Sequence, residues 1–153
     1  MPSEFIKRQK SDLIRDITSL GSLIDYILFL VVLLALGNFY LLKRAFLGLI
    51  LIYIVIIIIR TFYFKERPEK LSHKSYIESL DASSFPSLHS ARISFLSAIL
   101  MKYYNNLYFS ALAALVVLAV CYSRIQLKKH DFADAIFGIL LGVLAYFIIS
   151  GFF

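Results

Sequence analysis

The chain has 153 residues, of which 60% are apolar, and its mean hydropathy is +0.80. This composition excludes a soluble domain and predicts one integral-membrane domain, residues 1–153, built only from helices, with about five spans of roughly 20 residues each. The net charge of +6 is spread over short connections between apolar runs, which argues against nucleic acid and favours anionic or phosphorylated lipid as the partner. The lone Cys121 excludes an intrachain disulfide and a thiolate metal cluster.

Residues 1–21 are expected to form an amphipathic helix that lies in the membrane interface. Apolar side chains recur there at spacings of three, four or seven residues, and lysine, arginine and aspartate occupy the other face. The segment lacks the continuous apolar core of a signal peptide, and Gly21 is expected to bend or end the helix. An ordinary solvated helix is the alternative interpretation.

Residues 22–153 are expected to form the transmembrane bundle, with spans at about 22–42, 45–64, 90–104, 107–122 and 132–153. The third and fourth of these are short and should continue into their flanking loops. In the last span, Gly138 and Gly142 either make a face for close helix packing or occur there by chance.

Two polar loops are expected on the same side of the membrane, because two spans separate them. The first covers residues 65–89 and is the longest connection, with Pro68 and Pro86 arguing against one continuous helix. The second covers residues 123–129. Together these loops can build one site.

The second loop leads into a histidine and a carboxylate that favour nucleophilic chemistry. If the chain is helical from about His130, Asp134 lies one turn further on the same face and its carboxylate can reach one ring nitrogen. That contact fixes the tautomer and raises the basicity of the other nitrogen. Arg124 could hold a phosphoryl group against it. The alternative is a short basic loop in which His130 and Asp134 act as helix caps.

The first loop begins and ends with residues that suit an anion. Arg60 and Arg67 are seven residues apart, which is two helical turns, so both guanidinium groups can point at one spot. An arginine at mid-bilayer costs roughly 2.5 to 3.5 kcal/mol, so Arg60 must snorkel or line a wet cavity. At the other end, Ser87 offers a hydroxyl and an N–H, and His89 opens the third span, where a helix N-terminus favours anions. An interfacial histidine is the alternative for His89.

These three pieces, taken together, resemble the type 2 phosphatidic acid phosphatase and vanadium haloperoxidase superfamily. Its motifs are lysine, six residues, Arg-Pro; then Pro-Ser-Gly-His; then Ser-Arg, five residues, His, three residues, Asp. In this chain they correspond to Arg60, Arg67-Pro68; Pro86-Ser87-Leu88-His89; and Ser123-Arg124, His130, Asp134, with the same spacing. The chain departs from the family pattern at Arg60, where the family has lysine, and at Leu88, where it has glycine.

The resemblance implies that His130 is the nucleophile that forms a phosphohistidine, that Asp134 orients it, and that His89 is the general acid toward the leaving oxygen. It also implies a set of phosphate-binding residues, which are Arg60, Arg67, Ser87, Leu88 through its N–H, and Arg124. No metal or other cofactor is needed. A leucine in place of glycine would be unfavourable if the loop required a positive φ.

The implied function is that of a lipid phosphatase in the cell membrane. Polyprenyl diphosphate ranks first as substrate, followed by phosphatidate and a phosphatidylglycerol phosphate. A lipid phosphotransferase and a catalytically silent lipid-phosphate-binding protein are the alternatives, whereas the apolar spans exclude a soluble haloperoxidase. Resembling enzymes face the site away from the cytoplasm, and we expect the same here, although the count of lysine and arginine favours the reverse.

Overall fold

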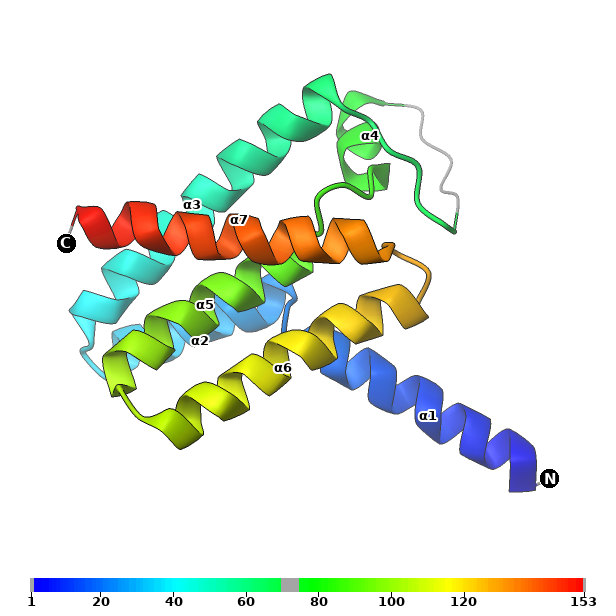
Figure 1. The fold of residues 1–153 in the computed structure, drawn as a ribbon, viewed down its shortest axis with the longest axis horizontal. Helices are drawn as coiled ribbons and strands as arrows, with labels where there is room; N and C mark the ends of the chain where they lie inside the picture. The colour runs from blue at the N-terminus through cyan, green and yellow to red at the C-terminus, as the bar shows by residue number, and fades with distance from the viewer. Residues whose placement is uncertain (1, 70–74, 153) are drawn as a thin grey trace.

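The structure is a computed structural model that describes residues 2–69 and 75–152. In these ranges the chain is helical and contains no strand, which confirms the all-α prediction (Figure 1). Residues 70–74 of the long polar loop lie outside the described residues. The helices are α1 (Pro2–Ser19), α2 (Leu23–Ala35), α3 (Phe39–Phe62), α4 (Tyr76–Ala82), α5 (Leu88–Tyr104), α6 (Leu107–Gln126) and α7 (Phe132–Gly151).

Within the described residues, three helices are long and apolar enough to cross a membrane, and these are α3, α6 and α7. A fourth span results if Arg8–Ser19 and Leu23–Ala35, which meet at an angle of 50°, are counted as one. The third predicted span, 90–104, corresponds to α5, which has 17 residues and contacts α3, α6 and α7. Its position between other helices explains why α5 can carry three serines and an arginine where a lipid-facing span could not.

The first helical hairpin turns earlier than predicted. Spans at 22–42 and 45–64 would put the turn between residues 42 and 45, but α2 ends at Ala35 and α3 begins at Phe39. Gly37 has a φ of +67°, which glycine adopts without strain, and the Asn38 side chain accepts a hydrogen bond from the Leu41 N–H at 3.1 Å. The glycine and the asparagine cap therefore set this boundary, and Lys43 lies inside α3.

The N-terminal segment forms a helix that ends at Ser19, as the sequence indicated, and the chain turns at residues 20–22. In Figure 1, α1 projects away from the rest of the bundle. It is attached to α6, where the Ser123 hydroxyl donates a hydrogen bond to Thr18 Oγ1 at 2.9 Å. Ile6 and Leu13 are exposed. The placement of α1 in the membrane interface stays a prediction.

Close packing of α7 on α5 depends on two glycines. A Cβ at Gly138 would lie 2.5 Å from the Ser87 carbonyl oxygen, and one at Gly142 would lie 2.4 Å from that of Ala91. Backbone carbonyls cannot move aside as a flexible side chain would, so no larger residue fits at either position. The interpretation of these glycines as a packing face is therefore confirmed.

The two predicted loops meet at one end of the bundle. The Ser87 N–H donates to the Asp134 carbonyl at 3.0 Å, which joins the start of α5 to the first turn of α7. The Glu69 N–H donates to the Lys128 carbonyl at 3.0 Å, which joins the first loop to the second. This confirms that both loops lie on the same side of the bundle.

Gly138→Ala should lower the stability of the protein in detergent, because the added methyl group overpacks the contact with Ser87. Such overpacking typically costs about 1 to 3 kcal/mol. Thermal unfolding should therefore occur at a lower midpoint. Gly151→Ala is the matched control, since a Cβ there meets nothing within 4 Å. Equal midpoints for the two variants would show that α5 and α7 do not need this close approach.

Candidate active site

A cavity of about 400 Å³ lies at the end of the bundle where the two loops meet. This volume is in the range of small-molecule sites, about 300 to 1,000 Å³. It brings together six of the eight predicted site residues, while the other two, Ser87 and Asp134, are fully buried. The cavity is lined by Ser22, Leu23, Ile24, Tyr53, Arg60, Arg67, Asp81, Leu88, His89, Arg92, Arg124 and His130.

His130 is oriented by a backbone carbonyl as well as by the predicted carboxylate. Its Nδ1 lies 2.7 Å from the Ser84 carbonyl oxygen and 3.7 Å from Asp134 Oδ2. A carbonyl can only accept a hydrogen bond, so Nδ1 carries the hydrogen and the neutral ring keeps its lone pair on Nε2. The last helix begins at Phe132, as the predicted span 132–153 has it, with Asp131 as its N-cap, so His130 lies just before the helix and not in its first turn. The basic nitrogen nevertheless faces the cavity side of the ring, where Arg124 lies 3.5 Å away.

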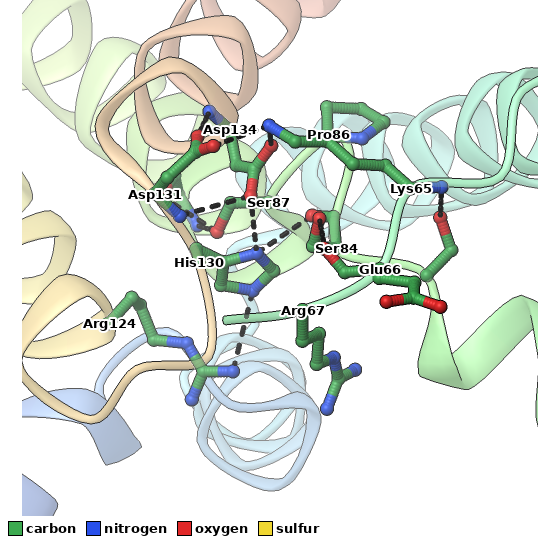
Figure 2. A network of polar contacts seen from close by, with 12 residues as sticks. Lys65, Glu66, Arg67, Ser84, Pro86, Ser87, Arg124, His130, Asp131 and Asp134 are labelled. Atoms are coloured by element: carbon green, nitrogen blue, oxygen red, sulfur yellow. Dashed lines mark hydrogen bonds and ion pairs between the residues drawn. The ribbon is translucent and has the colours of Figure 1, made fainter. Parts of the chain in front are cut away.

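Asp134 is held by a lysine that the sequence did not single out. Lys65 Nζ lies 2.7 Å from Asp134 Oδ1 and 2.6 Å from Asp131 Oδ2 (Figure 2). The Asp131 N–H donates to Asp134 Oδ2 at 3.1 Å, and the Asp134 N–H donates to Asp131 Oδ1 at 2.9 Å. This is a capping box, so Asp134 caps α7 and faces His130 at the same time. Burial lowers the pKa of Lys65, but its bonds to the two carboxylates outweigh burial and raise that pKa overall.

The surroundings of His130 keep its ring neutral. Burial lowers the pKa of His130 below its ordinary value of 6.5, and the positive charges of Arg124 and Arg67 lower it further. The hydrogen-bonding and charge of Asp134 oppose this shift without reversing it. A neutral ring with Nε2 unprotonated is the form that can attack an electrophile.

Two arginines lie on the side of the His130 ring that faces away from Asp134, as Figure 2 shows. Arg124 belongs to the last turn of α6, and Arg67 lies in the loop after α3, where it contacts the Asp81 carbonyl. The Nε atoms of both guanidinium groups are buried without a hydrogen-bond partner. Free donors of this kind, next to a nucleophilic nitrogen, suit the oxygens of a phosphoryl group.

Arg60 reaches the same cavity by a different geometry from the one predicted. Because α3 ends at Phe62, Arg60 and Arg67 do not lie on one helix, and the two-turn argument is wrong. Both nevertheless line the cavity. Arg60 donates to the Leu80 carbonyl at 2.7 Å and to the Pro86 carbonyl at 3.0 Å. It therefore fixes the loop before α5, and its contact with a substrate stays a prediction.

The leucine that replaces glycine is accommodated without backbone strain. Leu88 is the first residue of α5, and the non-glycine residues with positive φ in the described ranges are Asn105 and Lys128. In the described structure the Leu88 N–H has no partner, as expected for the first turn of a helix. Ser87 is the N-cap, and its hydroxyl contacts Ser90 at 3.0 Å, so its contact with a substrate also stays a prediction.

Sequence reasoning missed several residues of the cavity. Arg92 lies three residues after His89 on α5, and its Nη2 is 3.5 Å from His89 Nδ1. An arginine in an otherwise apolar helix, on the same face as a candidate histidine, is the signal that could have found it. Tyr53 and the α1–α2 turn carry no comparable signal, since nothing in the sequence indicates that they approach α5. The turn lies against His89, because a Cβ at Gly21 would be 3.0 Å from the His89 carbonyl oxygen.

The family model of the PAP2 superfamily matches residues 27–153, which include all three motifs. The chain belongs to the PAP2 superfamily. The match confirms the resemblance and also covers most of the first helical hairpin, which is formed by α2 and α3. A comparison with curated proteins found no match.

Two solved PAP2-type structures are similar in fold. One is a transmembrane PAP2-type phosphatidylglycerolphosphate phosphatase from Bacillus subtilis, with 24% identity and a TM-score of 0.72 over 94% of this chain and 76% of that chain. The other is LpxE from Aquifex aeolicus, with 22% identity and a TM-score of 0.78 over 94% of this chain and 86% of that chain. At these identities the likeness establishes the fold. Together with the apolar helices, it identifies this PAP2 protein as an integral membrane protein with a phosphatase fold.

The neutral state of His130 can be measured directly. In protein with isotope-labelled histidine, assigned by comparison with His130→Ala, nuclear magnetic resonance should give a titration midpoint below 6.5. Arg124→Gln should raise the midpoint, because it removes a positive charge that lowers the pKa of the ring. A midpoint at or above 6.5 in the parent protein would contradict the description of His130 as a buried neutral base.

Proposed function

We propose that the protein is a lipid phosphatase that transfers a phosphoryl group from its substrate to His130 and then hydrolyses the phosphohistidine, without a metal ion. One observation carries this proposal. His130 Nε2 lies 3.5 Å from the Arg124 guanidinium group in a cavity that also contains Arg67 and His89. A transferring phosphoryl group spreads negative charge over its equatorial oxygens, and fixed cations beside the nucleophile stabilise that charge.

The reaction has two steps. In the first, His130 Nε2 forms a bond to phosphorus while the bond from phosphorus to the leaving oxygen breaks, and His89 donates a proton to that oxygen. In the second, water attacks the phosphohistidine, His89 accepts a proton from that water, and orthophosphate leaves with His130 restored. Arg124 and Arg67 bind the equatorial oxygens in both steps, and the Leu88 N–H adds a neutral donor. Asp134 and the Ser84 carbonyl hold the ring in place throughout.

The lining of the cavity suits a lipid. Leu23 and Ile24 belong to it, and both are exposed on the outside of the bundle, so the cavity adjoins surface that would face lipid. A substrate can therefore place its phosphate among the arginines while its tail stays in the membrane. Polyprenyl diphosphate remains the first candidate, followed by phosphatidate and phosphatidylglycerol phosphate. The last of these is the lipid given in the name of the similar phosphatase from Bacillus subtilis.

We place the site on the extracytoplasmic side of the membrane. The arginines on that side are explained by anion binding, so we leave them out when lysine and arginine are counted to predict the orientation in the membrane. Lys43 near the start of α3 and Lys102 near the end of α5 lie at the opposite ends of helices whose other ends reach the site. These residues would then face the cytoplasm.

The helical conformation of Leu88 supports an active enzyme over a silent binding protein. A leucine forced into positive φ would have strained the backbone, and its N–H would then have been less able to bind phosphate. Since Leu88 starts α5 with ordinary geometry, its N–H remains a donor and only its side chain narrows the cavity. A phosphotransferase would form the same phosphohistidine and pass the group to an alcohol.

Purified protein in detergent should release orthophosphate from at least one of the three candidate lipids in the presence of a chelator. His130→Ala should reduce that release by at least about 1,000-fold, because it removes the nucleophile. Thermal unfolding of the variant, measured alongside, should show that it is folded. Asp134→Asn should lower the rate more than it weakens substrate binding, since Asp134 orients the nucleophile without contacting the substrate.

Two results would contradict the proposal. Undiminished phosphate release by His130→Ala would exclude His130 as nucleophile, and loss of release on chelation would require a metal. If an added alcohol captures the phosphoryl group in place of water, the protein is the phosphotransferase.

A further inference from the structure

Arg92 is a buried cation of the cavity that the proposed phosphoryl transfer does not use. It lies on α5 with only 3% of its surface exposed, and its Nη1 donates to the Tyr53 hydroxyl at 3.1 Å. Its Nε is buried without a hydrogen-bond partner. Among the described residues, no carboxylate lies within ion-pair distance of Arg92. A tyrosine hydroxyl cannot neutralise a guanidinium group, so the charge of Arg92 lacks a counterion.

The cavity as a whole also has more positive than negative charge. Among the described residues, four arginines and a single acidic residue, Asp81, line the cavity. The Asp81 carboxylate is largely exposed and lies 3.9 Å from the Arg67 guanidinium group. Removing a cation from water without a partner is costly, so a cavity of this kind is expected to bind an anion. A phosphate monoester brings about two negative charges at most. An anion with a further charged group would match four arginines better.

The position of Arg92 indicates where that further group lies. Arg124 and Arg67 flank His130, the proposed nucleophile, whereas Arg92 lies beside His89, the proposed acid toward the leaving oxygen. The atom bonded to the leaving oxygen must therefore come close to Arg92. In a phosphate monoester that atom is carbon. In a diphosphate it is the phosphorus of a second phosphate, whose oxygens would meet the Arg92 guanidinium group.

We propose that Arg92, supported by Tyr53, binds the second phosphate of a lipid diphosphate, and that it makes the site select diphosphates over monophosphates. This inference rests on the proposed function. His130 Nε2 forms a bond to the terminal phosphorus, the bridging P–O bond breaks, and the lipid monophosphate leaves with a proton from His89. Water then releases orthophosphate from His130. Arg92 holds the lipid monophosphate throughout the first step.

A different role for Arg92 has to be separated from this one. Its guanidinium group faces His89 Nδ1, so it could simply position that ring. A positioning role would affect every substrate of the enzyme to the same degree, because each needs the acid. A second-phosphate subsite affects diphosphates far more. The ratio of kcat/KM values for a diphosphate and a monophosphate with the same lipid chain therefore distinguishes the two roles.

The test compares Arg92→Gln with the parent on a polyprenyl diphosphate and the matching polyprenyl monophosphate. The ratio of kcat/KM values, diphosphate over monophosphate, should fall by about 10- to 100-fold, the effect of losing a charge-assisted hydrogen bond. Arg92→Lys, which keeps the positive charge, should retain part of the preference for the diphosphate. Arg44→Gln is the matched control, since Arg44 is also a buried arginine bonded to a tyrosine hydroxyl, outside the cavity. It should leave the ratio unchanged.

If the parent protein turns over neither lipid, that result counts against the proposed function. A binding experiment then tests the role of Arg92 independently of turnover. Isothermal calorimetry with methylenediphosphonate and orthophosphate should show tighter binding of the diphosphonate to the parent. Arg92→Gln should remove most of that preference. The inference is overturned if the parent shows no preference for the diphosphonate, or if Arg92→Gln weakens both anions, or both lipid reactions, equally.

Discussion

The close contact of α7 with α5 is the feature on which the rest of the site depends. Gly138 places the backbone of α7 against the Ser87 carbonyl, and the Ser87 N–H bonds to the Asp134 carbonyl at 3.0 Å. Two motifs more than 40 residues apart in the sequence are thereby fixed relative to each other. His89, at the start of α5, and His130, just before α7, then face one cavity. In a membrane, where apolar side chains gain little by leaving lipid for protein, small residues that allow close backbone packing are a main source of such contact.

The site combines a rigid nucleophile with unsatisfied positive charge. His130 is held on one side by the Ser84 carbonyl and by Asp134, which Lys65 fixes in turn, so the ring has little freedom to rotate. On the other side the guanidinium group of Arg124 keeps a free, buried Nε. A protein that folds with these charges unpaired has lost stability in exchange for a preorganised anion site. Burial lowers the pKa of His130, and the same charges lower it further, so the ring is neutral, as a nucleophilic imidazole must be.

Motif spacing was enough to predict the family and six of the residues that line the cavity, and the apolar composition predicted the all-helical membrane fold. The way the backbone places these residues was harder to predict from the sequence. The argument that placed Arg67 two helical turns after Arg60 was wrong, because α3 ends at Phe62, yet the loop brings both to one place. The partners Ser84 and Lys65 depend on how the long loop folds back on α7. Sequence periodicity predicts only how the residues of one helix or strand are arranged. Contacts between different elements cannot be predicted from it.

The central claim is that His130 carries the phosphoryl group during turnover, and trapping that group tests it most directly. Protein mixed briefly with a lipid diphosphate labelled in its terminal phosphate, then quenched in base to preserve phosphohistidine, should carry the label. Mass spectrometry should place it on the peptide that contains His130, and the label should disappear with time as orthophosphate is released. Phosphate release without any labelled protein in a single turnover, or label on another residue, would contradict the account.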